Sequence, residues 1–160
     1  MQVPLQLNNY FFPIVSVVAN PDFRPEQAEK KGPPLLNVEV VATSHDESLY
    51  EVQLDIRISS TDENPSQYSV ILKAIGIFTV DADLENKEGV VKATGASILY
   101  SASRELLLTV MSRGPWAPIM LNLTAFRFEG TPHPVENPGS SIISSKNVKR
   151  SKGAKVKNVK

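Results

Sequence analysis

The sequence predicts an α+β fold, in which a four-stranded antiparallel sheet of Greek-key or meander order is followed by one long helix. Residues 50–59 alternate strictly between apolar and polar side chains, as expected of a strand with one covered face. Three further β-branched segments are separated by turn-forming residues. Thr94–Pro118 is the one long segment with helical periodicity, and it follows all the strands.

Four segments have the composition of strands: Tyr10–Ala19, Leu35–Thr43, Tyr50–Ser60 and Tyr68–Val80. The first is β-branched and aromatic on both faces, so we expect it to be buried on two sides. Pro13 lacks an amide donor and predicts a sheet edge or a bulge at that point. Gly76 in the fourth strand predicts a bulge or a close approach of the backbone. Asn20–Pro34 is predicted to be a loop.

The predicted helix carries a wide apolar arc, made of Ile98, Leu99, Ala102, Leu106, Leu107, Thr109, Val110 and Met111. An arc this wide exceeds what a helix lying on one sheet needs, so a second layer is predicted, which could belong to another copy of the chain. Ser112–Pro115 are predicted to end the helix, with Gly114 in a left-handed cap. Asp81–Ala93 is expected to hold only a frayed helical turn.

The chain of 160 residues is predicted to form one domain, residues 1–130, followed by a Pro/Gly/Ser-rich linker and disordered tail, residues 131–160. Seven of the 17 basic residues lie in residues 144–160, which contain no acid. The rest of the chain therefore has ten basic against 17 acidic side chains, a net charge near −7. An acidic domain thus carries a basic tail.

The composition excludes several function classes. There is no cysteine, and His45 and His133 are interpreted as surface residues, so we expect no metal site and no cofactor. No nucleophile elbow, P-loop or dinucleotide fingerprint is present, so no enzyme is predicted. No segment approaches the roughly 18 apolar residues of a membrane helix, so we expect a cytoplasmic protein without membrane insertion.

Large apolar side chains gather near the two ends of the predicted domain: Tyr10, Phe11, Phe12, Trp116, Ile119, Met120, Phe126 and Phe128. They either complete a core or form an exposed groove that binds other chains. Trp116 is the best candidate for a binding residue. Prolines at both ends of its loop hold the loop extended, and an indole offers a large contact area at low entropic cost.

Four segments in this order resemble the SecB family of protein-export chaperones: YEVQLDIRI (50–58), Gly76-Ile77-Phe78, ILYSASRELLLTVMSRGPW (98–116) and LNLTAFRF (121–128). The resemblance covers about residues 10–128. It implies an ATP-independent holdase that forms a homotetramer, a dimer of dimers whose main helices lie between sheets. Unfolded polypeptides would bind in long hydrophobic grooves.

The resemblance also implies roles for individual side chains. Five residues of the long helix would serve assembly: Ile98, Leu99, Ala102, Leu106 and Val110. Five others would line or flank the client groove: Phe12, Trp116, Ile119, Leu121 and Phe126.

The sequence departs from the family pattern in two places. SecB proteins have a second C-terminal helix and an acidic tail, whereas Phe128 is followed here by EGTPHPVENPGSS and a basic tail. The family docks the SecA motor through acidic residues of the first and fourth strands. The matching positions, Ile14, Val18 and Ile71, are not acidic, so SecA is a candidate partner whose usual docking residues are absent.

Alternatives to an export chaperone stay open. SecB-like proteins also serve as dedicated chaperones of toxin–antitoxin systems, which hold an aggregation-prone antitoxin. The basic tail, Lys146–Lys160, could instead neutralise several phosphates of a nucleic acid. Nucleic acid is the least favoured partner, because the tail has no interleaved aromatic residues and the body is acidic.

Overall fold

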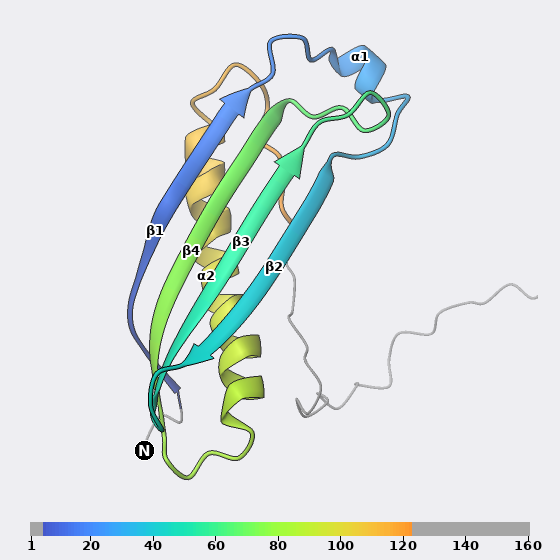
Figure 1. The fold of residues 1–160 in the computed structure, drawn as a ribbon. Helices are drawn as coiled ribbons and strands as arrows, with labels where there is room; N and C mark the ends of the chain where they lie inside the picture. The colour runs from blue at the N-terminus through green and yellow to red at the C-terminus, as the bar shows by residue number, and fades with distance from the viewer. Residues whose placement is uncertain (1–4, 123–160) are drawn as a thin grey trace, which may run out of the picture.

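The computed structural model describes residues 5–122 (Figure 1). It contains β1 (Leu5–Ala19), α1 (Pro25–Ala28), β2 (Leu35–Ser44), β3 (Leu49–Ser59), β4 (Tyr68–Val80) and α2 (Lys87–Met111). The strands are all antiparallel and lie in the order β1-β4-β3-β2. Because β2, β3 and β4 follow one another while β1 lies beside β4, the sheet is a Greek key and not a simple meander. The predicted α+β fold is confirmed.

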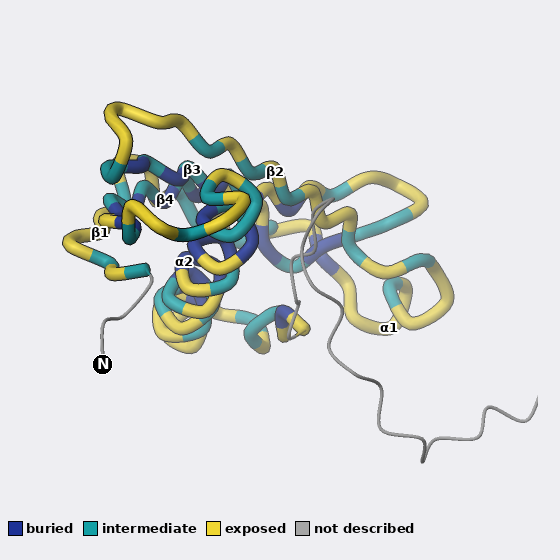
Figure 2. The backbone as a smooth tube through the Cα atoms, turned by 90° about the horizontal axis from the view of Figure 1, so that it is seen from below, coloured by how far each residue is buried: buried dark blue, intermediate teal, exposed yellow. Residues whose placement is uncertain are grey.

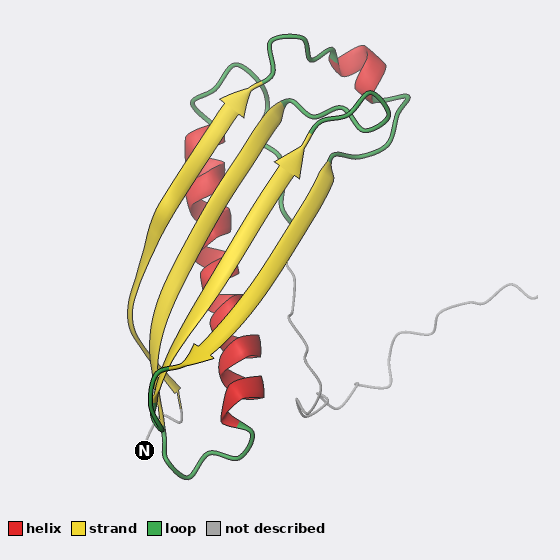
Figure 3. Ribbon diagram, in the orientation of Figure 1, coloured by secondary structure: helices red, strands yellow, loops and turns green. Residues whose placement is uncertain are grey.

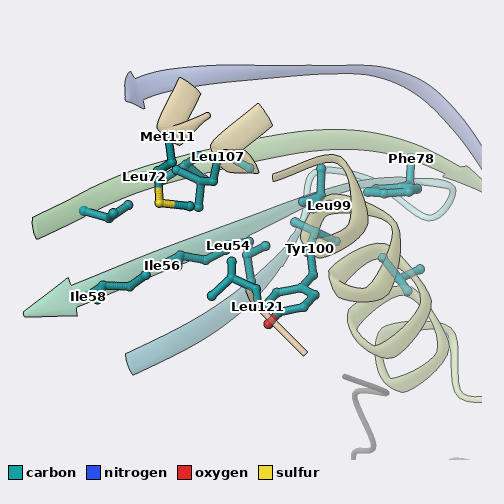
Figure 4. Close-up of a cluster of buried hydrophobic side chains, with 14 of the residues drawn as sticks. Leu54, Ile56, Ile58, Leu72, Phe78, Leu99, Tyr100, Leu107, Met111 and Leu121 are labelled. Carbon is teal, nitrogen blue, oxygen red and sulfur yellow. The ribbon is translucent and has the colours of Figure 1, made fainter. Parts of the chain in front are cut away.

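The molecule has two layers, and α2 covers one face of the sheet (Figure 3). Alternate residues of β3 and β4 are buried on that face, as the alternation of residues 50–59 predicts for β3. The side chains of Leu54, Ile56 and Leu72 meet those of Leu99 and Leu107 from the helix, forming the core (Figure 4). The opposite face, which we call the outer sheet face, is not covered by any described element (Figure 1).

Two glycines let the helix approach the sheet around the buried ring of Phe78. A Cβ atom added at Gly76 would lie 2.8 Å from Cε2 of Phe78 and 3.0 Å from Cδ2 of Leu99. One added at Gly95, on α2, would lie 2.9 Å from Cγ2 of Val52 and 3.1 Å from the Phe78 ring. The close approach predicted for Gly76 is therefore confirmed, while the pairing of β3 with β4 runs through it without a bulge.

β1 lies at the edge of the sheet, and its register with β4 shifts between Phe11 and Ile14. Both effects predicted for Pro13 are therefore confirmed. The prediction that this strand is buried on two sides is wrong, because no residue of β1 is fully buried. An edge strand has one neighbour, and the outer sheet face beside it is uncovered, so Phe11 and Val18 stay exposed.

α2 ends at Met111, just before Ser112–Pro115, as predicted, but its start and the conformation of Gly114 differ from the prediction. The helix begins at Lys87, within the segment expected to hold only a frayed turn, because Val91 and Ala93 extend its buried side. Gly114 does not adopt a left-handed conformation. It is needed for its size, because an added Cβ would lie 2.9 Å from Cε1 of Tyr68. The predicted loop 20–34 contains a single helical turn, α1.

Candidate functional site

An apolar pocket of ≈ 300 Å³ lies where the start of β2 meets the loop that follows α2. We call it the β2 pocket, and its lining residues are Pro33, Pro34, Leu36, Ile58, Tyr100, Ile119, Met120, Leu121 and Asn122. Leu36 and Met120 are exposed, whereas Leu121 and Tyr100 are buried and lie side by side (Figure 4). The Tyr100 hydroxyl donates to the carbonyl of Asn122 at 3.1 Å. The base of the pocket is therefore formed by buried side chains, and its rim is formed by exposed apolar ones.

The predicted client-binding residues separate into three groups. Ile119 and Leu121 line the β2 pocket, although Leu121 is buried against the core. Phe12 is half-buried on β1, where its ring meets Tyr10 edge-on at 5.8 Å, and β1 lies at the opposite edge of the sheet from β2. Phe126 lies outside the described residues. The structure thus places two of the five predicted residues in one site.

The sequence predicted an exposed Trp116 side chain that binds clients, but the structure places this side chain differently. Its indole N–H donates to the carbonyl of Asn20 at 3.0 Å, and its ring meets Phe23 edge-on at 5.5 Å. The side chain is half-buried against the core. Trp116 therefore anchors the loop that carries Ile119 and Leu121, and it does not line the β2 pocket.

Six of the nine pocket residues are not identified from the sequence: Ile58, Tyr100, Asn122, Pro33, Pro34 and Leu36. The last three come before or at the start of β2, and more than eighty residues of chain separate them from Ile119. In the sequence, the double proline indicates only a loop. Only the pairing of β2 at the sheet edge brings them to the loop after α2.

Figure 2 shows exposed and half-buried residues along the side of α2 that faces away from the sheet, and four residues of the predicted interface have these burial classes. Ile98 and Val110 are 38% and 37% exposed, and Ala102 and Leu106 are half-buried. We call these four residues the exposed helix face. Leu99 is 0% exposed in the core of its own chain, so its assignment to the interface is corrected. The Nε atom of Arg104 is buried and has no acceptor among the described residues.

The three positions that were compared, from the sequence alone, with a SecA-docking surface, Ile14, Val18 and Ile71, lie together on the outer sheet face. Ile14 is paired with Lys73, Val18 with Ser69, and Ser16 with Ile71, so all three apolar side chains project to the same side. Ile14, Val18 and Ile71 are 45%, 58% and 48% exposed. The nearest ion pair on this face joins Lys73 Nζ to Asp55 at 3.4 Å. This region is therefore an apolar surface and not an acidic one.

The titratable side chains of the β2–β3 turn lie on the surface. The prediction for His45 is confirmed, because its side chain is exposed and its Nε2 lies 3.4 Å from a carboxylate oxygen of Glu51. Backbone N–H groups of Ser48 and Leu49 donate to Asp46 and hold the pKa of that carboxyl below its usual value. No group of His, Asp and Glu in residues 5–122 could hold a metal ion. No helix in the same range is long and apolar enough to cross a membrane.

Relatives share this fold and part of this sequence. Curated SecB export proteins from Ehrlichia ruminantium (strain Gardel) and Anaplasma phagocytophilum (strain HZ) are 29% and 32% identical over 89 and 83 residues. These matches cover 50% and 49% of this chain, and the chain spans about half the length of both relatives, 51% and 52%.

A solved structure has the same fold. It is the SecB-like chaperone Rv1957 of Mycobacterium tuberculosis, in complex with a ChAD peptide from the antitoxin HigA1. The TM-score is 0.60 at 16% identity, and the match covers 78% of this chain and 94% of that one. The family model described as preprotein translocase subunit SecB matches residues 6–128, which include α2 and all residues of the four strands except Leu5. The chain therefore belongs to the SecB family.

Proposed function

We propose that this chain is a nucleotide-independent chaperone that holds non-native polypeptides, acting in the cytoplasm and not as an enzyme. The observation that carries the proposal is the β2 pocket, with its apolar lining and the exposed side chains of Leu36 and Met120. Concave apolar sites of this volume accept one or two large apolar side chains. Such side chains are exposed in unfolded chains and buried in folded ones, so the pocket distinguishes the two states.

The sheet edge next to the pocket supports binding of an extended chain. β2 ends the sheet, so its backbone groups on the side away from β3 have no strand partner within residues 5–122. An extended polypeptide can pair with such an edge while every second side chain turns towards the pocket. Backbone pairing does not depend on sequence, which suits a site that accepts many clients.

The direct test is an aggregation assay. A chemically unfolded client is diluted into buffer with or without the purified full chain, and light scattering is recorded without nucleotide. We expect scattering to fall as the chain is added, and added ATP to have no effect. Unchanged scattering at a several-fold molar excess of the chain would refute the proposal.

We further propose that the chain assembles into a homotetramer through the exposed helix face. Four apolar side chains on a helix that already covers its own sheet need a second apolar partner to leave water. A second copy of the chain provides an identical face, as homo-oligomers commonly do.

A dedicated chaperone of an antitoxin is the second candidate function. It is favoured by the apolar outer sheet face, where Ile14, Val18 and Ile71 replace acidic residues that would dock SecA. The solved relative that shares this fold binds a peptide of an antitoxin. The nucleic-acid alternative rests on residues 144–160, which lie outside the described part of the chain.

We predict that SecA does not bind this chain at micromolar concentration. Apolar side chains at the three positions cannot form the ion pairs on which electrostatic docking depends. Co-elution of purified SecA with the full chain in size-exclusion chromatography checks this. Co-elution that is lost on Ile71→Arg would contradict the prediction and restore the export role.

A further inference from the structure

The hydroxyl group of Tyr68 joins the end of α2 to the loop that follows. Tyr68 is the first residue of β4 and is buried. Its Oη lies 3.1 Å from the carbonyl oxygen of Met111 and 2.7 Å from that of Trp116, and it accepts the backbone N–H of Trp116 at 3.1 Å. The single hydroxyl proton can be donated to either carbonyl, so all three contacts suit a tyrosine.

The loop depends on such side chains for its position. No backbone–backbone hydrogen bond holds residues 115–121 within the described part of the chain. Besides Tyr68, the side chain of Gln67 donates to Ala117 at 3.3 Å, and the Trp116 indole donates to the carbonyl of Asn20. Asn20 is itself bonded to Gln67 through its backbone N–H at 2.9 Å. The start of β4 and the end of β1 thus hold one end of the loop.

Gly114 shows how closely the loop approaches the tyrosine. An added Cβ at this residue would lie 2.9 Å from Cε1 and 3.0 Å from Cζ of Tyr68. Contacts this short are not tolerated, so any larger residue would push the loop away from the ring. Three residues beyond Trp116, the loop delivers Ile119 to the β2 pocket.

We infer that Tyr68 is a positioning residue for client binding. Its hydroxyl sets the path of the loop and thereby the place of Ile119 and Leu121 in the β2 pocket. Tyr68 itself is not among the pocket's lining residues, so it acts through the loop. This inference rests on the proposed function, because it concerns the geometry of the same binding site.

The test is Tyr68→Phe, which keeps the buried ring and removes the hydroxyl. Trp116 is the only tryptophan of the 160-residue chain, so its fluorescence reports on the loop directly. We expect a red-shifted emission and about twofold stronger quenching by acrylamide, because the indole gains access to water. We also expect the Kd for fluorescein-labelled, reduced α-lactalbumin to rise about tenfold, since buried hydrogen bonds are lost.

Tyr50→Phe is the matched control. Tyr50 is also buried, but it lies at the opposite end of the sheet, paired with Phe78. The Tyr50→Phe variant should leave both the tryptophan emission spectrum and the Kd for the client unchanged. If Tyr68→Phe does not fold by circular dichroism, Gly114→Ala displaces the same loop and is expected to give the same two changes.

The outcomes separate the inference from the proposed function. A wild-type spectrum or a wild-type Kd in a folded Tyr68→Phe protein overturns the inference. If the wild-type chain binds no unfolded client at all, the proposed function fails. The fluorescence comparison still shows in that case whether the hydroxyl positions the loop, and an unchanged spectrum overturns the inference on its own.

Discussion

The double variant Ile119→Asp, Met120→Asp is expected to lose the ability to hold unfolded polypeptides. Both side chains line the β2 pocket, and neither is fully buried, although Ile119 also packs against the core, so folding of the variant is checked by circular dichroism. Each apolar contact replaced by a carboxylate removes roughly 1.5–3 kcal/mol of burial and adds a charge that must lose water. Client Kd should therefore rise about a hundredfold or more, measured by fluorescence anisotropy and by the loss of aggregation suppression.

A matched control separates the pocket from net charge. Val18→Asp, Val41→Asp adds the same two charges at exposed apolar positions on the outer sheet face. This control should bind clients within about twofold of the wild type, because surface substitutions away from a site have small effects. Equal binding by the pocket variant and the wild type would show that clients bind elsewhere.

The double variant Ile98→Asp, Val110→Asp is expected to convert a tetramer into smaller species. Two exposed residues of the exposed helix face would then carry like charges, which repel when identical faces meet. Size-exclusion chromatography with multi-angle light scattering measures the mass directly. A tetrameric mass in the variant would place the interface elsewhere, and a monomeric wild type at micromolar concentration would refute the assembly proposal.

Leu99→Ala is the informative comparison for this prediction, because Leu99 is adjacent in sequence to Ile98 but fully buried. Its truncation should lower the free energy of unfolding by about 2–5 kcal/mol, measured by denaturant titration. The mass of the folded variant should stay that of the wild type. Opposite responses from neighbouring residues would separate the core side of α2 from its assembly side.

The strands of the sheet were predictable because alternation is a local property. Tyr50–Ser60 was predicted to within one residue of β3, and β4 was predicted with both of its ends. The alternating apolar residues Tyr50–Ile58 of β3 are buried against α2, so the pattern in the sequence matches the pattern of burial there, whereas β4 also carries Ile71 on the outer sheet face. The fold class followed from the order of these elements, since a helix after four strands has one sheet to cover.

Burial of β1 could not be read from its composition. The composition of a β-branched, aromatic segment does not show whether another element covers it. Here no described element covers the outer sheet face beside Phe11 and Val18. The role of Leu99 was misassigned for a related reason. A wide helical arc shows that two apolar sides exist, but not which residues turn towards the sheet.

The candidate site was predicted only in part. Ile119 and Leu121 stood out as apolar residues in a loop, but Pro33 and Leu36 had no local signal of their own. Trp116 was predicted to bind clients, but it does not line the β2 pocket, and its place depends on a carbonyl of Asn20, which lies 96 residues away. Tyr68 looked like any aromatic residue at the start of a strand.

The sequence by itself therefore determined the strands, the long helix and the presence of surplus apolar surface. Only the tertiary structure decided which apolar residues form the core, the pocket and the exposed helix face. The periodicity of apolar residues arises from the backbone geometry of each helix or strand and repeats every few residues, so a short stretch of sequence is enough to show it. Burial depends on which distant segment packs on top, and for this chain the pairing of β2 at one edge and the hydroxyl of Tyr68 bring those segments together.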